Sequence, residues 1–170
     1  RLGMWDMKWR LEDMAFQVLQ PQKYREISHI LRTKRTERER YINKVTDLLG
    51  KELRGAGVSA DVNGRPKHIF SIYKKMQKYE TEGKEFGQIY DLFAVRVLVN
   101  EASECYSALG VVHGLWRPLP AQFDDYIGNP KENLYQALHT IVLGPGGVPL
   151  EIQIRTHNMH QLAEYGVAAH

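Results

Sequence analysis

The stretch IYDLFAVRVLV, residues 89–99, decides the fold class, because it is apolar at almost every position. A strand with one solvated face alternates apolar and polar residues, whereas a strand that is covered on both faces does not. We therefore expect a central, buried strand here. Its two charges, Asp91 and Arg96, each need a partner or a ligand, since an unpaired buried ion is costly.

Alternation along this strand places Asp91 on one face with Phe93 and Val95, and Arg96 on the opposite face. The two charges are therefore not expected to pair with each other. For Asp91 the sequence favours a metal or substrate role. For Arg96 a structural ion pair is an equal alternative.

The neighbouring segments complete a sheet. Residues 58–64 alternate as a half-buried strand and are followed by a helix, and residues 101–116 form a second helix. Residues 136–143 and 148–155 are the strands of a hairpin with a Gly-Pro-Gly-Gly turn, and Thr156 caps a last helix. The predicted fold class is α+β, a mixed sheet flanked by helices, with an N-terminal helical arm.

The first third of the chain is helical. Apolar residues recur at helical spacing over residues 4–19, on so broad a surface that we expect this helix to be largely buried. Pro21 marks the start of a second helix, and the spacing from Thr36 to Glu39 predicts a capping box at the start of a third. We therefore divide the chain into a helical arm, residues 1–56, and a sheet domain, residues 57–170. The opening lacks a helix start signal, so we expect a piece of a longer protein.

Composition narrows the class of protein. The 170 residues fit one domain with an appendage, and 43% hydrophobic with 25% charged residues are ordinary globular values. No apolar run approaches the roughly 18–20 residues that span a bilayer, and no secretory signal opens the chain. The single Cys105 forms no internal disulfide and, in an apolar helix, is expected in the core. These features predict a cytoplasmic protein without a membrane partner.

The net charge of +3 is unevenly distributed. Residues 1–54 carry 13 Lys/Arg against 8 Asp/Glu, a net +5, and residues 55–170 carry 10 against 12, a net −2. In the arm the charges alternate, as in RTKRTERERY, which is typical of a solvated helix face. No direct nucleic-acid partner is expected, because proteins that track the polyanion need a basic body.

The segment Gly64-Arg65-Pro66-Lys67, with Ser71 one turn further on, indicates a phosphate site. A turn that opens a helix brings together backbone N–H groups and the positive end of the helix dipole, and the two cations add charge. The alternative is a surface turn with two solvated cations. The segment is not a Walker loop, because the pattern G-x-x-x-x-G-K-[ST] is absent from the sequence.

In LEIQIR, residues 150–155, three apolar residues alternate with Glu151, Gln153 and Arg155. This polar row is either the solvated face of an antiparallel sheet or part of a site. If Glu151 lies near Asp91, two carboxylates from different strands hold a Mg²⁺ on a polyphosphate, with water completing its shell.

The histidines are not equally good candidates for a metal or ligand contact. His157, His160 and Glu164 share one helix face, but the pattern HExxH is absent, so capping or packing is favoured over a metal site. His139, in a strand beside the loop that carries Tyr135, is the better candidate for a ligand contact.

Four ordered motifs resemble those of the synthetase domain of RelA/SpoT proteins, which make guanosine tetra- and pentaphosphate. They are GRPKHIFSIYKKM, YDLFAVRV, YIGNPKENLYQALHT and EIQIRTHNMHQLAEYGVAAH, and they cover about residues 57–170. The opening RLGMWDMKWRLEDMAF resembles the segment that follows the hydrolase domain in the long members of the family. The resemblance implies a nucleotidyltransferase-like mixed sheet in a cytoplasmic enzyme. Regulators such as the ribosome would act only through regions outside this chain.

The resemblance also implies a pyrophosphokinase, in which the 3′-hydroxyl of GDP or GTP attacks the β-phosphorus of ATP and AMP leaves. Grouped by ligand, the implied residues are Arg65, Lys67 and Ser71 for ATP; Lys131, Asn133, Tyr135 and His139 for the guanosine nucleotide; and Asp91 and Glu151 for Mg²⁺ and catalysis. Glu151 is implied to accept the 3′-hydroxyl proton, and Tyr135 to stack on guanine. The role of Arg96 stays open.

Before the guanosine loop, members of the family carry either a basic R-x-K-D or an acidic E-x-D-D segment. The first is typical of members that both hydrolyse and synthesise, the second of synthetase-only members. Here the residues are Gln122-Phe123-Asp124-Asp125, so the loop follows the acidic version but lacks its first carboxylate. This predicts a different demand for Mg²⁺, since extra metal offsets an acidic loop beside polyphosphates. The alternative is that Asp124 faces solvent or caps the turn.

Two other functions stay open at this stage. A polymerase-β-like nucleotidyltransferase that acts on nucleic acid usually shows G-S and a D-x-D pair, whereas Asp91 is followed by Leu92 and Phe93. A catalytically silent regulatory module of a longer protein is less favoured, because the residues implied for catalysis and for guanosine binding occur together.

Overall fold

The computed structural model describes residues 4–65, 67–83 and 93–166, with side chains from residue 7 onward. Its centre is a five-stranded mixed sheet in the order β1-β2-β5-β4-β3. The strands are β1 (Ala60–Gly64), β2 (Ala94–Val99), β3 (Arg117–Asp125), β4 (Leu138–Leu143) and β5 (Pro149–Thr156). The strand expected at residues 89–99 is therefore an interior strand over the part that is described. Asp91 lies outside the described residues.

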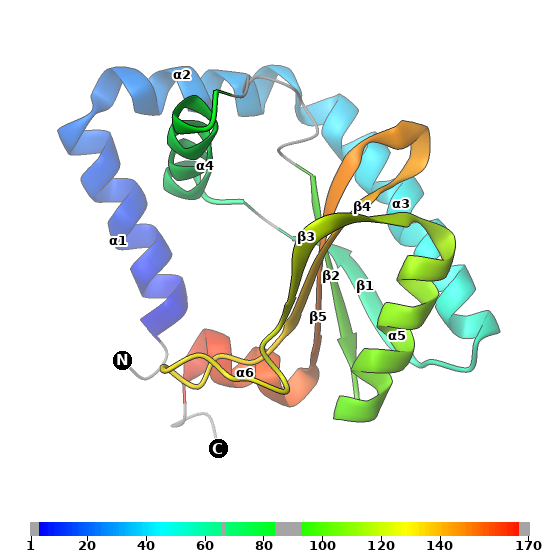
Figure 1. Ribbon diagram of the computed structural model, residues 1–170. Coiled ribbons are helices and arrows are strands. Elements are labelled where there is room, and N and C mark those ends of the chain that lie inside the picture. Colours follow the sequence, from blue (N-terminus) through cyan, green and yellow to red (C-terminus); the bar gives the residue numbers. More distant parts are fainter. Residues whose placement is uncertain (1–3, 66, 84–92, 167–170) are drawn as a thin grey trace.

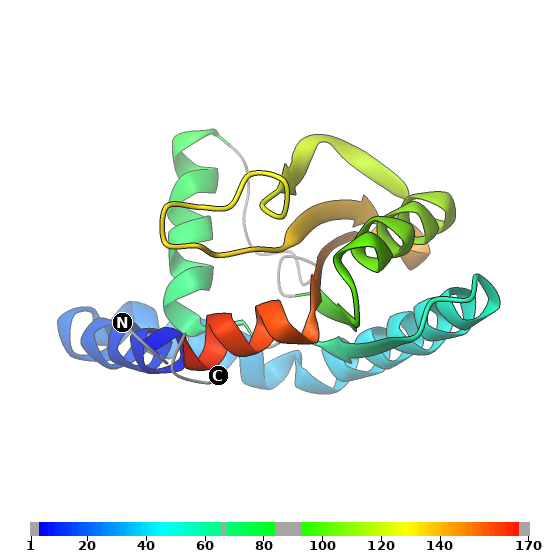
Figure 2. The ribbon, with the colours of Figure 1, turned by 90° about the horizontal axis from the view of Figure 1, so that it is seen from below.

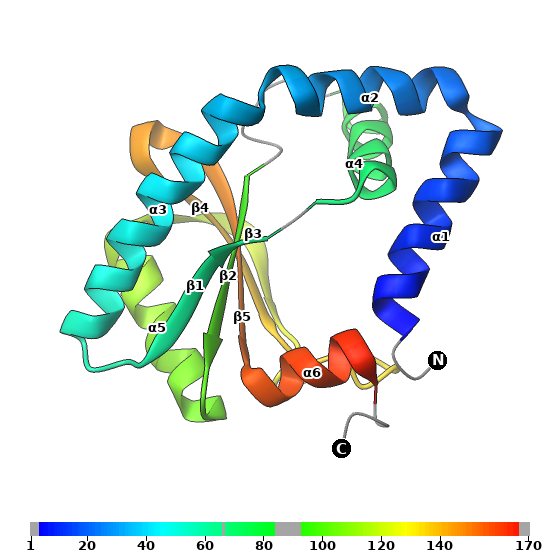
Figure 3. The same ribbon diagram turned by 180° about the vertical axis from the view of Figure 1, so that it is seen from behind.

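In the described residues, six α-helices flank the sheet (Figure 1). They are α1 (Met4–Leu19), α2 (Pro21–Thr33), α3 (Arg35–Gly55), α4 (Ile69–Thr81), α5 (Ala102–Leu115) and α6 (His157–Tyr165). In Figures 1 and 3, α3 and α5 lie on one side of the sheet, and α1, α2 and α4 lie on the other. Among the helices described, none is long and apolar enough to cross a membrane.

The main core lies between the sheet and the pair α3 and α5. Alternate residues of β2 and β5 point into it, and they are almost fully buried: Val95, Val97, Val99, Leu150, Ile152 and Ile154. The helices contribute Val45, Leu49 and Leu53 from α3, and Cys105, Ala108 and Val112 from α5. Cys105 is in the core, as predicted. Because β2 and β5 are parallel and covered on this side, their apolar alternation fixes which residues face the other side.

The predicted hairpin is confirmed. β4 and β5 pair antiparallel from Leu138 opposite Ile154 to Leu143 opposite Pro149, and the short helix Pro145–Gly147 joins them. Thr156 Oγ1 accepts the N–H of Met159 at 3.0 Å and so caps α6, also as predicted.

The segment that was expected to be a loop contains the edge strand β3, which is a correction. β3 pairs antiparallel with β4, and its register shifts between Pro118 and Phe123. Prolines and a bulge are tolerated at a sheet edge because one side of the strand has no ladder to complete. Leu119, Ala121 and Phe123 do alternate along the strand, but Pro118 and Pro120 argue against a strand in the sequence, so the pattern did not reveal it.

The capping box predicted at Thr36 is also wrong. α2 continues into α3 through Lys34, and the N–H of Arg38 bonds to the carbonyl of Lys34 at 2.9 Å, so this helix start is joined to a preceding helix. A capping box occurs instead at α5, where Glu101 and Glu104 satisfy each other's backbone N–H groups.

A second apolar cluster lies on the other side of the sheet. Its most buried members are Phe16 of α1, Ile27 of α2 and Ile72 of α4, with partly buried residues of α2 and α4 around them. The apolar side of α4 therefore packs against the arm. The expectation that the first helix is largely buried is wrong, since Met7, Leu11, Met14, Val18 and Leu19 are 51–78% exposed. The periodicity correctly predicts an apolar helix surface, but it does not show how much of that surface is covered by other elements.

Tyr41 joins the arm to the hairpin. Its hydroxyl donates to the carbonyl of Pro145 at 2.9 Å, and its ring stacks on Phe93 at 4.3 Å between centroids. Burial raises the pKa of this hydroxyl to about 12, so it stays a donor. A Cβ at Gly144 would lie 2.8 Å from Tyr41 Oη and 3.3 Å from Leu150 Cδ2. A side chain at position 144 would therefore clash with Tyr41, and only glycine fits without a shift of its neighbours.

We expect Gly144→Ala to lower the free energy of unfolding by roughly 1–3 kcal/mol, the usual cost of overpacking. The matched control is Gly110→Ala on α5, where nothing lies within 4 Å of the new methyl group. This control should be neutral or stabilising by up to about 1 kcal/mol, because alanine favours a helix. In a Tyr41→Phe background the cost of Gly144→Ala should fall, since the atom that it meets first is gone. Denaturant unfolding measures all of these variants, and an equal cost in both backgrounds would contradict the explanation.

Candidate active site

The sheet face opposite the main core carries a row of polar residues, one from each strand. In the order β1, β2, β5, β4 and β3, the row is Asn63, Arg96, Gln153, His139 and Asp124, each opposite the next in the strand registers. Residues that pair across neighbouring strands project from the same face. The row therefore crosses the whole sheet on the side of α1 and α4.

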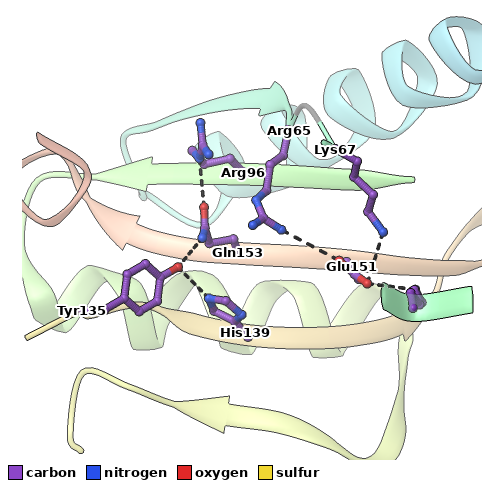
Figure 4. A network of polar contacts seen from close by, with 8 residues as sticks. Arg65, Lys67, Arg96, Tyr135, His139, Glu151 and Gln153 are labelled. Carbon is purple, nitrogen blue, oxygen red and sulfur yellow. Dashed lines mark hydrogen bonds and ion pairs between the residues drawn. The ribbon is translucent and has the colours of Figure 1, made fainter. Parts of the chain in front are cut away.

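Hydrogen bonds connect the middle of this row (Figure 4). Arg96 Nε donates to Gln153 Oε1 at 2.9 Å, and Gln153 Nε2 bonds to the hydroxyl of Tyr135. The same hydroxyl lies 2.8 Å from His139 Nε2. Burial, together with the charges of Arg65 and others nearby, lowers the pKa of His139 to about 4, so this ring is neutral near pH 7.

The polar residues of β5 are not a solvated face, so that alternative is wrong. Gln153 is 4% exposed and Arg155 is 2% exposed. Arg155 Nη2 donates to His160 Nδ1 at 2.7 Å and lies 3.6 Å from Glu164. Glu164 also lies 4.0 Å from Arg96. The two arginines of this face, Arg96 and Arg155, therefore both pair with Glu164 of α6.

The α6 histidines pack and pair, as favoured from the sequence. His160 accepts from Arg155, and His157 Nε2 lies 3.4 Å from Asp61 Oδ2. Within residues 4–65, 67–83 and 93–166, no group of three or more His, Cys, Asp or Glu side chains is placed to hold a metal ion.

Glu151 is surrounded by three cations (Figure 4). Its carboxylate lies 3.0 Å from Lys75 Nζ, 3.2 Å from Lys67 Nζ and 3.9 Å from Arg65 Nη1. Backbone pairing explains part of this arrangement. The N–H of Arg65 bonds to the carbonyl of Ala94, and Ala94 lies opposite Glu151, so Arg65 and Glu151 flank the same residue of β2.

The surroundings of this cluster shift the pKa of the Glu151 carboxylate and that of the Lys67 ammonium group. Burial alone would raise the pKa of Glu151, but Lys67, Lys75 and Arg65 outweigh it and bring the value down to about 2. Burial lowers the pKa of Lys67 to about 8, against the attraction of Glu151. Lys75 was missed in the sequence, although it lies one helical turn after Ser71 and thus on the same side of α4.

The predicted phosphate segment lines a cavity of about 130 Å³. Its walls are Trp9 of α1, Arg65, Lys67, His68, Ser71, Ile72 and Lys75 around α4, and Glu151 of β5. One amide at the start of α4 already has an acceptor, because Phe70 N–H donates to Asp13 Oδ1 at 2.9 Å. The structure thus brings Arg65, Lys67 and Ser71 together, as expected, and adds an arm residue at the helix start.

A second cavity, of about 170 Å³, adjoins the first through Trp9 and Arg65. It is lined by Trp9, Arg65, Arg96, Lys131, Tyr135, His139, Gln153, Arg155, Ala163 and Glu164. Four of these side chains are cationic and one is anionic, so the cavity suits an anionic ligand with a ring to place against Tyr135. Figure 2 shows α6 beside the first turns of α1, at the edge of this region.

In the loop between β3 and β4, the ammonium group of Lys131 lies over two tyrosine rings. Lys131 Nζ lies 4.5 Å from the ring centre of Tyr126 and 5.3 Å from that of Tyr135. Asn133 Oδ1 accepts the N–H of Tyr135 at 3.1 Å, which shapes the loop. Lys131, Tyr135 and His139 line the second cavity, whereas Asn133 lines a more open hollow with Tyr126 and Lys131.

The register of β3 separates the two adjacent carboxylates. Asp125 Oδ1 accepts the N–H groups of Ile127 and Gly128 at 2.9 and 2.8 Å, and Oδ2 accepts the hydroxyl of Tyr106 at 2.8 Å. Led by the Gly128 bond, these contacts lower the pKa of Asp125. The turn cap is therefore Asp125, and the alternative that Asp124 caps the turn is wrong.

Asp124 is exposed on the polar face, opposite His139. Burial and the Asp124 carboxylate raise the pKa of the neighbouring Tyr126 hydroxyl. Gln122 is exposed in the irregular part of β3, between Pro118 and Phe123. The exposure of Asp124 agrees with the alternative that this residue faces solvent, and its neighbour in the loop between β3 and β4 is Tyr126.

The donor set suits a hard cation that shares its ligands with phosphate. Mg²⁺ in nucleotide sites is bound through one or two carboxylates and the substrate phosphates. Glu151 is a carboxylate that lies among cations suited to phosphate, and Asp91 lies outside the described part of the chain. The residues present fit such an ion.

Comparison with known proteins gives close relatives. The chain is 51% identical over its whole length to a GTP pyrophosphokinase of Streptomyces coelicolor and 50% identical to one of Escherichia coli. It is 48% identical to the bifunctional (p)ppGpp synthase/hydrolase RelA of Mycobacterium tuberculosis. The chain spans about a fifth of the length of these relatives, 20%, 22% and 23%.

Solved structures share the fold. The small alarmone synthetase 1 of Bacillus subtilis, bound to its product pppGpp, gives a TM-score of 0.58 at 21% identity over 76% of each chain. The small alarmone synthetase 2 of the same organism gives 0.53 at 26% identity, over 74% of this chain and 71% of that one. The expected nucleotidyltransferase-like mixed sheet is confirmed. The model of the region found in RelA/SpoT proteins matches residues 64–170, more than half of the sequence, so this chain belongs to the RelA/SpoT family.

Proposed function

We propose that this chain transfers the β,γ-diphosphate of ATP to the 3′-hydroxyl of GDP or GTP, and so produces AMP and (p)ppGpp. The observation that carries the proposal is Glu151, a carboxylate held among three cations on the same sheet face as Tyr135. A phosphate-binding group and a base-binding group are thus adjacent. The names of the relatives, GTP pyrophosphokinase among them, support the same reaction.

The ATP half of the site consists of Arg65, Lys67 and Ser71, with Lys75 added from the structure. Pyrophosphoryl transfer needs alignment and the neutralisation of charge more than covalent chemistry. Lys67 and Lys75 are held close together by Glu151, at 3.2 and 3.0 Å from its Oε1. They can move onto the phosphates without a large change in position. In this proposal Arg65, which lines both cavities, would also stack on the adenine ring.

The guanosine half consists of Lys131, Asn133, Tyr135 and His139. Tyr135 offers a ring for stacking, and its hydroxyl is held by His139 and Gln153. Gln153 is in turn held by Arg96. The base would therefore stack on a ring whose orientation is set from two neighbouring strands.

Glu151 is the group that we propose takes the 3′-hydroxyl proton. With a pKa of about 2 it is a weak base while its three cations are in place. Phosphates that bind Lys67, Lys75 and Arg65 compete for the same charges, so nucleotide binding raises the basicity of this carboxylate. Mg²⁺, held by Glu151 and Asp91, would neutralise charge on the transferred diphosphate.

Two other functions are less well supported. Acting on nucleic acid would need a track of positive charge, whereas the sheet part of the chain is net negative. A silent regulatory module would not need Glu151, Tyr135 and Lys131 to converge on adjoining cavities. We place the reaction in the cytoplasm, where both nucleotides are available.

The proposed reaction is tested by incubating the chain with ATP, labelled GDP and Mg²⁺. A labelled product that migrates more slowly than GDP is expected on thin-layer chromatography. Binding of both nucleotides without any such product would favour the silent module, and incorporation of label into a polynucleotide would favour the other nucleotidyltransferase.

Replacing Glu151 by Gln should reduce kcat by at least roughly 100-fold, the lower range for loss of a positioned base. Binding of each nucleotide should change little, because the side chain keeps its size. Glu52→Gln, at an exposed position of α3 on the other side of the sheet, is the matched control and should keep wild-type kcat. Retention of most of kcat by Glu151→Gln would refute the assignment.

Replacing Tyr135 separates the ring from its hydroxyl. Tyr135→Ala should raise KM for the guanosine nucleotide by roughly 5- to 150-fold, since base stacking on an aromatic ring is worth about 1–3 kcal/mol. Tyr135→Phe keeps the ring and loses the bonds to His139 and Gln153, so KM should rise much less. Steady-state kinetics at saturating ATP distinguish the two, and an unchanged KM in Tyr135→Ala would exclude stacking.

The acidic loop should set the demand for Mg²⁺. We expect the rate of the wild-type chain to rise more steeply and more cooperatively with Mg²⁺ than that of Asp124→Lys, because extra metal must offset the carboxylate beside the polyphosphates. Glu52→Lys makes the same change of charge at an exposed position of α3, on the other side of the sheet, and should follow the wild type. Superimposable Mg²⁺ curves for wild type and Asp124→Lys would reject this role.

A further inference from the structure

The helix that carries Ser71 and Lys75 packs against the arm (Figures 1 and 3). The apolar side of α4 contributes Ile72 to the second cluster, together with Phe16 of α1 and Ile27 of α2. All members of that cluster come from α1, α2 and α4. The main core, by contrast, is built from the sheet with α3 and α5. The ATP half of the site therefore belongs to one packed unit and Glu151 to the other.

The start of α4 is held by a carboxylate from α1. His68 occupies the N-cap position, and its own side chain makes no capping bond. Asp13 takes that role from another helix: its Oδ1 accepts the N–H of Phe70 at 2.9 Å, and its Oδ2 lies 3.9 Å from His68 Nδ1. A carboxylate at this position satisfies a backbone donor and complements the positive end of the helix dipole.

A second contact comes from one turn earlier in α1. The ring of Trp9 stacks on the ring of His68, with centroids 4.8 Å apart and planes 7° from parallel. Because Trp9 and Asp13 are four residues apart, they lie on the same side of α1 and meet the start of α4 together. Trp9 also lines both cavities of the site. Two side chains of α1 thus fix the segment between Lys67 and Ser71.

We propose that Asp13 is a positioning residue for the ATP half of the site. It acts through Phe70 and His68, which hold the first turn of α4 so that Lys67, Ser71 and Lys75 face Glu151. The proposal rests on the function proposed above, since it concerns the same site. The arm is then part of the catalytic unit. Loss of the Asp13 contact changes the ATP half, whereas the guanosine half is built on β4 and the loop between β3 and β4 and makes no contact with Asp13 that the proposal requires.

Asp13→Ala should weaken ATP specifically. We expect KM for ATP to rise about 5- to 30-fold, with KM for GDP within about twofold of the wild-type value. Asp13→Asn retains an acceptor for Phe70 and should restore most of the affinity. Glu26→Ala removes an exposed ion pair with Lys23 elsewhere on the arm and is the matched control, with both KM values unchanged.

Binding of a non-hydrolysable ATP analogue, measured by calorimetry without GDP, separates this proposal from the proposed reaction. A loss of analogue affinity in Asp13→Ala, reversed in Asp13→Asn, supports the positioning role even if no alarmone is formed. Equal rises of both KM values, or a lower melting temperature with unchanged analogue affinity, would overturn it. Where Asp13→Ala does not fold, Asp13→Glu decides. Its extra methylene displaces the carboxylate from Phe70, so a rise of at least threefold in KM for ATP alone is expected, and no rise refutes the proposal.

Discussion

The alternation of β5 is the constraint on which the site depends. Leu150, Ile152 and Ile154 are buried in the main core, and this forces Glu151 and Gln153 onto the opposite face. A shift of one residue would exchange the two sets and place charges in the core, which is too costly to occur. β5 is the middle strand of five, so its pairing with β2 and β4 also determines which of their residues face the core and which face the site. The register of β5 therefore determines both the stability of the core and the composition of the site.

Electrostatics then connects the two packed units. Glu151 projects from the sheet, and two of the cations that meet it, Lys67 and Lys75, lie on or beside the helix that packs on the arm. Without nucleotide, the carboxylate shields these lysines from each other, which a buried pair of like charges requires. In the proposed reaction, bound phosphates would neutralise these lysines in place of the carboxylate. The charges of the site would then be balanced with and without nucleotide, and Glu151 would lose its cationic partners when phosphates bind them.

Sequence patterns predicted what depends on period and on short-range chemistry. The interior strand, the hairpin and the Thr156 cap follow from alternation, a glycine-rich turn and a hydroxyl at a helix start. β3 was missed because Pro118 and Pro120 interrupt a short alternating run, and prolines usually argue against a strand. The burial of α1 was overestimated, since an apolar residue such as Leu11 shows no partner in the sequence. The meeting of Arg96 with Gln153 and of Asp13 with Phe70 depends on strand register and helix packing, which no local pattern encodes.

The adjacent carboxylates of β3, Asp124 and Asp125, have different roles because strand alternation places them on opposite faces of the sheet. Asp125 points toward α5, where Tyr106 and two backbone N–H groups occupy both of its oxygens. Asp124 lies opposite His139, on the polar face that carries the proposed nucleotide site, and its carboxylate accepts a hydrogen bond from the hydroxyl of Tyr126. Asp125 instead maintains the turn from which the β3–β4 loop begins. An acidic pair beside the proposed site is then consistent with anion binding, because one carboxylate builds the loop and only the other shares a face with the site.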